Sequence, residues 1–152
     1  MRRRILILLS AMIATFMATG AVTASAAPIE PSDVEAAAGW DCDRGGILES
    51  DRDSGGWDVY DGCTKSSGGS VSAYFAAYGE VITICDNFPN GHATWVWVTV
   101  EGHGTDAYRS YGSDSCTTEP DPNYHEGKDV SIKVCTSNTD AAKCAVEYGG
   151  RS

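Results

Sequence analysis

The central third of the chain has the clearest alternation of apolar and polar positions. From Val71 to Val100 the residues are mostly β-branched, aromatic or small, and apolar side chains recur at every second position. This period is typical of half-buried β-strands. Two reversals interrupt the pattern, one at Gly79-Glu80 and one at Pro89-Asn90-Gly91, where proline and glycine suit a tight turn. The segment therefore predicts three consecutive antiparallel strands.

Shorter strands are expected after this segment. Asp129–Cys135 alternates cleanly, with its valines and isoleucine on one face, and Thr105–Tyr111 and Ala141–Tyr148 also fit strands. Many short strands joined by glycine turns are typical of antiparallel sandwiches and barrels. The sequence predicts an all-β fold, a small antiparallel β-sandwich or a partly open barrel, stapled by disulfides.

The segment from Trp40 to Cys63 is less regular. It is rich in aspartate and glycine, and only Trp57–Tyr60 is expected to form a strand, at the edge of a sheet.

The N-terminus has the features of a targeting signal. Three arginines precede an apolar run that ends near Val22, and Ala24-Ser25-Ala26 is a small-x-small cleavage site. The apolar run approaches the length of a membrane span, but the cleavage site favours a signal peptide over residues 1–26. We expect a flexible acidic leader over residues 27–39 and a single domain over residues 40–152, secreted to the extracellular space.

Six cysteines in a small exported chain predict three disulfides. Cys135 and Cys144 flank a turn between two expected strands, so they can face each other across a hairpin at the roughly 3.5–4.5 Å between Cβ atoms that a disulfide needs. Cys85–Cys116 is the second expected pair, and Cys42–Cys63 follows by elimination. The sequence has no Cys-x2-Cys pair, which argues against zinc.

The chain is acidic, with a formal net charge of −10, and loss of the arginines of the signal peptide makes the mature part more acidic still. Such a surface repels phosphate backbones and anionic lipid heads. We therefore expect no nucleic-acid or membrane partner, and we expect a soluble monomer without a cofactor.

Five short motifs stand out in the C-terminal two-thirds of the chain. They are Tyr74-Phe75-Ala76-Ala77-Tyr78-Gly79-Glu80, Ile84-Cys85-Asp86, Asn90-Gly91-His92-Ala93, Gly112-Ser113-Asp114-Ser115-Cys116 and Val134-Cys135. These motifs resemble those of small secreted actinobacterial proteins with a cysteine-containing β-sandwich. The resemblance covers about Cys63 to the C-terminus and depends on the order of the cysteines and on the turn residues. The group has no established activity, so the resemblance implies a fold and an extracellular location but assigns no functional residue.

Two motifs could hold a metal ion. Asp41-Cys42-Asp43-Arg44-Gly45-Gly46-Ile47-Leu48 follows the beginning of an EF-hand calcium loop. The position that should carry a bidentate glutamate is Arg52, so a solvated turn is the better interpretation. The three histidines, His92, His103 and His125, lack metal-helix spacing. We expect no metal site.

The catalytic motifs are also incomplete. The sequence has no Gly-x-Ser-x-Gly elbow for a Ser/His/Asp hydrolase, and its histidines fall at expected turns. We therefore expect a protein that is not an enzyme.

Trp95 and Trp97 are the candidate binding residues. They share one face of a strand, and Val96, Val98 and Val100 share the other. If the valines point into the core, the indoles lie on the outer face. Either Trp40, Trp57 and Tyr60 fold over them as a cover, or they form a binding strip, with polysaccharide as the first ligand to test.

The leading hypothesis is a non-catalytic extracellular binding module for a polysaccharide or a secreted protein. Two alternatives are an inhibitor of a secreted protease or glycosidase, with the loop Gly112–Gly127 as bait, and a carbohydrate-binding protein that uses Trp95 and Trp97.

Overall fold

The computed structural model describes residues 39–112, 115–119 and 123–152. The predicted signal peptide (residues 1–26) and all but the last residue of the predicted leader (27–39) lie outside the described residues. Within the described ranges, no helix is long and apolar enough to cross a membrane.

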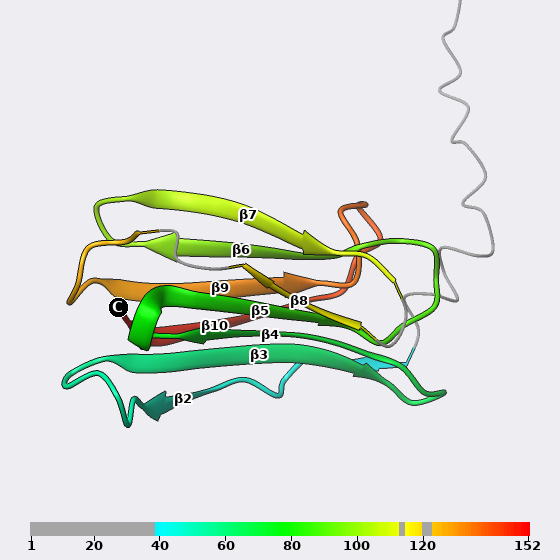
Figure 1. The fold of residues 1–152 in the computed structure, drawn as a ribbon. Coiled ribbons are helices and arrows are strands. Elements are labelled where there is room, and N and C mark those ends of the chain that lie inside the picture. Colours follow the sequence, from blue (N-terminus) through cyan, green and yellow to red (C-terminus); the bar gives the residue numbers. More distant parts are fainter. Residues whose placement is uncertain (1–38, 113–114, 120–122) are drawn as a thin grey trace, which may run out of the picture.

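The described chain is all-β, as predicted, and consists of ten strands and one short 3-10 turn, η1 (Figure 1). Their bounds are β1 Trp40–Asp41, β2 Gly46–Glu49, β3 Trp57–Lys65, β4 Ser70–Ala76, η1 Tyr78–Glu80, β5 Val81–Asp86, β6 Thr94–Val100, β7 Gly104–Ser110, β8 Ser115–Glu119, β9 Asp129–Cys135 and β10 Cys144–Arg151.

The strands form one antiparallel sheet that curls into a nearly closed barrel. Its order is β7-β6-β9-β10-β3-β4-β5-β8, with β1 and β2 paired to β3. The two ends of this order, β7 and β8, approach each other, and Ser110 Oγ and Thr117 Oγ1 lie 2.9 Å apart. In Figure 1, β5 and β8 lie in front of β9 and β10, so the sheet encloses a single interior.

The interior is filled by the inward side chains of alternate positions. On β6 and β9 these are the valines and the isoleucine that the alternation predicts, and all are at most 2% exposed. They pack against the inward residues of β3, β4 and β5 in one cluster. Because side chains alternate across a strand, this burial also fixes which residues point outward.

The predicted three-stranded unit between Val71 and Val100 is only partly correct. β4 and β5 pair along their whole length, but β5 then pairs with β8, and β6 pairs with β7 and β9. The segment between β5 and β6 crosses from one side of the barrel to the other. The buried Asp86 carboxylate holds this crossing, since it accepts hydrogen bonds from the Phe88 and Thr94 amides, both at 3.2 Å.

The prediction for the acidic segment is correct only in part. Trp57–Tyr60 is a strand, as predicted, but it begins the nine-residue strand β3 and has partners on both sides, so it does not lie at an edge. β3 pairs with β4 along one side and also pairs with β1, β2 and β10. The apolar positions Val59 and Cys63 are completely buried in this strand. Its aspartate and glycine content concealed the strand, since neither residue type favours β-structure.

The three disulfides join the expected pairs: Cys42–Cys63, Cys85–Cys116 and Cys135–Cys144. The latter two connect residues that are direct partners on neighbouring strands, with Cα atoms 4.0 and 4.1 Å apart. Cys42–Cys63 ties the N-terminal segment to β3. Three disulfides indicate an oxidising environment, such as the extracellular space.

Tyr124 closes one end of the barrel. Its ring packs against Phe75 in the core, and its amide donates a hydrogen bond of 2.5 Å to Glu80. Its hydroxyl donates to Asp106 at 3.0 Å and lies 2.9 Å from the hydroxyl of Tyr108. Burial, followed by these hydrogen bonds, raises the pKa of Tyr124. Tyr124 therefore fastens the segment before β9 to β7 and to the end of η1.

We expect Tyr124→Phe to lower the free energy of unfolding by about 1–2 kcal/mol, because Asp106 and Tyr108 lose a hydrogen-bond partner while the ring remains. Denaturant unfolding measures this change. Tyr148→Phe is the matched control, since Tyr148 is 69% exposed and should lose no stability. Equal stability of Tyr124→Phe and the native protein would contradict a role for the hydroxyl.

Candidate functional site

The curled sheet has two outer faces that point in opposite directions. The inward sides of β4 and β5 face those of β6 and β9 across the core. Consequently, the outward side chains of β6 and β9 lie on one side of the molecule and those of β4 and β5 on the other. Each face presents a different chemistry.

Trp95 and Trp97 lie on the outer face of β6, as predicted, and both are half-buried. Their rings stack side by side, with centroids 5.9 Å apart and an interplanar angle of 23°. Two exposed cations from the neighbouring strands lie over the indoles. Arg109 Cζ is 5.4 Å from the centroid of the Trp95 ring, and Lys133 Nζ is 5.3 Å from that of Trp97. The strand register explains these contacts, because Trp95 pairs with Arg109 and Trp97 with Lys133.

Of the two alternatives for the indoles, the structure contradicts the cover by Trp40, Trp57 and Tyr60. Trp40 packs edge-to-face on Phe88, Trp57 is 37% exposed at the beginning of β3, and Tyr60 lines a groove on the opposite face. Strands β9 and β10 separate β3 from β6. The pairing of β1 and β2 with β3, together with the Cys42–Cys63 bridge, holds this segment along β3 and away from the indoles.

The indoles belong to a larger surface, which we call the tryptophan face. It extends over four strands, and two of its residues, Val146 and Tyr148, are 45% and 69% exposed. All twelve of its positions are described, and the charged side chains among them are both basic. The first acidic residue of β9 on this side, Asp129, lies two positions beyond Ser131. The tryptophan face consists of Thr105, Ala107 and Arg109 on β7, Trp95, Trp97 and Thr99 on β6, Ser131, Lys133 and Cys135 on β9, and Cys144, Val146 and Tyr148 on β10.

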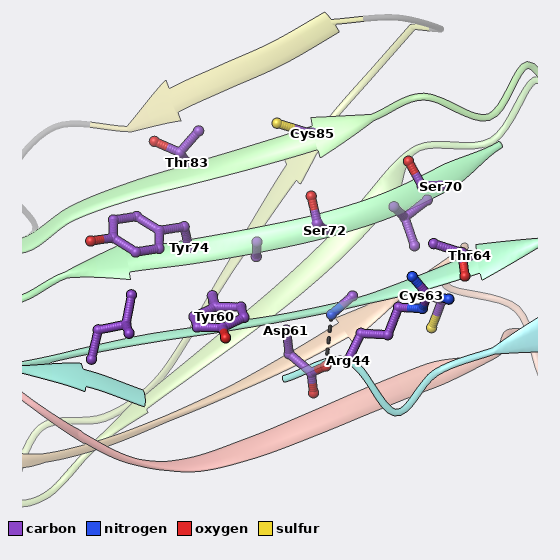
Figure 2. A pocket seen from close by; sticks show the side chains of 14 residues that line it. Arg44, Tyr60, Asp61, Cys63, Thr64, Ser70, Ser72, Tyr74, Thr83 and Cys85 are labelled. Carbon is purple, nitrogen blue, oxygen red and sulfur yellow. Dashed lines mark hydrogen bonds between the residues drawn. The ribbon is translucent and has the colours of Figure 1, made fainter. Parts of the chain in front are cut away.

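A groove of about 520 Å³ lies on the other face, over β3, β4 and β5 (Figure 2). Tyr60 and Tyr74 are partners on β3 and β4 and form its aromatic part. Next to them the outward residues are small, which leaves the groove open, and at Gly62 a Cβ atom would lie only 2.5 Å from the carbonyl oxygen of Val71. Four further lining residues carry hydroxyl groups, Thr64, Ser70, Ser72 and Thr83, and Arg44, Leu48 and Asp61 also line the groove.

The pKa of Tyr74, one of the two tyrosines in this groove, is shifted upward. Burial, and then its hydrogen bond to the Asp58 carboxylate, raises the pKa of Tyr74 to about 12. Asp58 also accepts a hydrogen bond of 2.8 Å from the Ala77 amide. The protonated tyrosine thus ties the end of β4 to β3, and its hydroxyl is a poor nucleophile or base near neutral pH.

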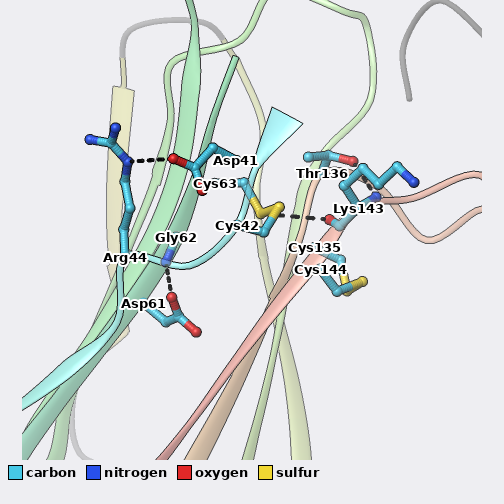
Figure 3. Close-up of a disulfide and its surroundings, with 10 residues drawn as sticks. All are labelled: Asp41, Cys42, Arg44, Asp61, Gly62, Cys63, Cys135, Thr136, Lys143 and Cys144. Atoms are coloured by element: carbon cyan, nitrogen blue, oxygen red, sulfur yellow. Dashed lines mark hydrogen bonds and ion pairs between the residues drawn. A yellow bond between two sulfur atoms is a disulfide. The ribbon is translucent and has the colours of Figure 1, made fainter. Parts of the chain in front are cut away.

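A buried carboxylate lies on the inward side of β3, beside the Cys42–Cys63 bridge (Figure 3). Asp61 is 4% exposed, and its Oδ1 accepts a hydrogen bond of 2.7 Å from the Gly62 amide. Burial raises the pKa of Asp61, and the charges of Glu147 and Asp43 raise it further, whereas the Gly62 hydrogen bond opposes this effect. Ionised Asp61 therefore lowers the stability of the folded state.

The motif that resembles a calcium loop is used for structure. Cys42 is bonded to Cys63, Arg44 forms an ion pair with Asp41 at 3.6 Å, and Gly46–Glu49 is strand β2. Among the described residues, no group of three His, Cys, Asp or Glu side chains is arranged to hold a metal ion.

The histidines lie apart from one another. The His92 amide bonds Asn90, and the His125 carbonyl accepts a hydrogen bond from Ser152. His103 is paired through Nε2 with Asp106 at 2.9 Å, and its ring contacts Tyr124 edge-on. A His–Asp pair can transfer protons, but the hydroxyls next to Asp106 are those of Tyr108 and Tyr124, and the pKa of each is raised by burial. The arrangement is therefore better explained as a structural contact between β7 and the segment before β9 than as a nucleophilic site.

Sequence reasoning found the two indoles but missed the cations. Arg109 occupies an outward position of a predicted strand, and so does Lys133, so their orientation could be read from the alternation. The strand order could not be read from the sequence, and the order β7-β6-β9 is what places Arg109 and Lys133 beside β6. The groove was also missed, because the aspartate and glycine content of the segment before β4 concealed most of β3, which forms the groove together with β4 and β5.

The surroundings of Asp61 predict a substitution whose effect on the melting temperature depends on pH. A carboxyl with a raised folded-state pKa costs stability when it is ionised, and this cost disappears as the pH falls below its unfolded value. We expect Glu147→Gln to raise the melting temperature at pH 7 by roughly 2–4 °C and to have no effect near pH 3, where the Asp61 carboxyl, whose pKa is raised, carries a proton. Asp140→Asn, an exposed site, is the control. An equal rise at both pH values would contradict the mechanism.

No protein-family model matches the chain, and no curated protein or solved structure has significant similarity to it. The assignment of a function therefore depends on the geometry described above.

Proposed function

We propose that this protein is a secreted, non-catalytic module that binds an extracellular polysaccharide through the tryptophan face. The observation that carries the proposal is the pair of stacked indoles on an outer strand, at the centre of a surface that also exposes Val146 and Tyr148. Aromatic rings on the surface of a sheet suit the apolar faces of sugar rings, since they provide a large and rigid contact area.

The remainder of the tryptophan face supports this proposal. Thr99 and Thr105 lie on neighbouring strands with their hydroxyl oxygens 2.8 Å apart, and Ser131 is the partner of Thr99 on the other side. These hydroxyls can donate to and accept from sugar hydroxyls. Because the face is built on paired strands and is bordered by the Cys135–Cys144 bridge, its shape is fixed before a ligand binds, which lowers the entropic cost of binding.

An inhibitor of a secreted hydrolase ranks second. The expected bait, Gly112–Gly127, contains strand β8, which is paired with β5 and bridged to it through Cys85–Cys116. It also contains Tyr124, which is 5% exposed. Both features tie this segment to the barrel, whereas a bait loop must enter the active site of its target.

We expect Trp95→Ala and Trp97→Ala each to abolish retention on a polysaccharide while the protein stays folded. Co-sedimentation with cellulose, chitin, xylan and cross-linked polygalacturonate measures retention, and circular dichroism checks the fold. Trp57→Ala is the matched control, because Trp57 is 37% exposed and lies on a different strand. If an alanine variant unfolds, the corresponding phenylalanine variant replaces it. Failure of the native protein to bind any member of the panel would refute the proposal.

A further inference from the structure

We propose that the ligand of the tryptophan face is an acidic polysaccharide, in which the sugar rings carry carboxylate groups. The inference deepens the proposed function and rests on it. It follows from the position of Arg109 and Lys133 over the indoles.

The two cations are more accessible than the rings beneath them. Arg109 and Lys133 are exposed, whereas Trp95 and Trp97 are half-buried. Arg109 Cζ also lies 5.0 Å from the centroid of the exposed Tyr111 ring. A sugar chain that reaches the indoles therefore meets a guanidinium and an ammonium group first. A neutral ligand would have to displace them from the rings, but a carboxylate gains a charge-assisted hydrogen bond.

Both cations are available for a ligand. Within the described part of the chain, the ion pairs are Arg44–Asp41 and His103–Asp106, and neither involves Arg109 or Lys133. The protein has a formal net charge of −10, with 21 acidic residues against 11 lysines and arginines. Carboxylates are therefore in excess, yet Arg109 and Lys133 lie outside the described ion pairs. The tryptophan face thus combines exposed positive charge with aromatic surface on an otherwise acidic molecule.

The spacing of the cations indicates a polymer. Arg109 lies on β7 and Lys133 on β9, with β6 between them. Their partners on β6, Trp95 and Trp97, are two residues apart, so the backbones of the two cations are about 12 Å apart. The two side chains flank the indole pair on opposite sides and can each pair with a different carboxylate. A chain of uronic acids supplies successive carboxylates along successive rings, whereas a single sugar supplies one.

Nucleic acid fits the surface less well. Its affinity comes mainly from many phosphate contacts, and the tryptophan face offers two cations. The acidic remainder of the protein repels any polyanion within the screening length of about 8 Å at physiological ionic strength. It repels a duplex, with one charge per about 1.7 Å of axis, more strongly than a glycan with one carboxylate per sugar ring. A carboxylated glycan with apolar ring faces uses both the cations and the indoles.

The test compares two ligands that differ in charge and otherwise only by one methyl group on each carboxyl. Affinity electrophoresis is run in gels that contain polygalacturonate or alginate, and in matched gels that contain the fully methyl-esterified form of each. We expect retardation by an acidic form at least tenfold stronger than by its ester. Arg109→Gln and Lys133→Gln should each weaken binding to the acidic form by about fivefold, the value of an ordinary exposed ion pair. Neither substitution should weaken binding to the ester, because a neutral ligand gains no ion pair from these cations.

Lys65→Gln is the matched control, since Lys65 also lies over an aromatic ring, that of Phe88 at 4.9 Å, but outside the tryptophan face. It should bind like the native protein. Equal binding of acid and ester forms, unchanged in the Arg109 and Lys133 variants, would overturn the inference and leave the proposed function intact. Absence of binding to acidic, esterified and neutral glycans alike would overturn both. Binding to single-stranded DNA in place of the acidic glycans would also overturn the inference.

Discussion

The burial of one side of a single curled sheet is the constraint on which the rest of this structure depends. Val96, Val98 and Ile132 are at most 1% exposed, and they meet Phe75 and Ile84 from the opposite side of the barrel. Because side chains alternate along a strand, a shift of one residue in register would move these apolar groups into water. The core therefore determines every outward position, and with it the composition of both outer faces.

Polar contacts at the ends of the strands hold the curled sheet together where the apolar core does not reach. Asp86 fixes the crossing from β5 to β6 through two backbone amides. Tyr124 joins the segment before β9 to β7, and its amide bonds the buried Glu80. The three disulfides add covalent connections between neighbouring segments. Such a scaffold can present a rigid surface to a ligand without a conformational change.

The two outer faces differ because the small and the aromatic residues are distributed unevenly between them. On the β3-β4-β5 side, the small residues Gly62, Ser70 and Ser72 leave a groove beside two tyrosines. On the other side, Trp95 and Trp97 stack and two cations lie over them. The second arrangement combines aromatic area with exposed positive charge that forms no ion pair within the described residues. This combination makes the tryptophan face the stronger candidate for ligand binding.

The sequence by itself determined the fold class, the inward direction of Val96 and Val130, and the outward direction of Trp95 and Trp97, because alternation is a local property of a strand. It also determined the pairing of Cys135 with Cys144 across a short hairpin. Only the tertiary structure decided which strands are neighbours, since pairing between distant segments depends on the packing of the whole core. That is why the sequence placed β6 beside β5, and why it could not bring Arg109 and Lys133 to the indoles.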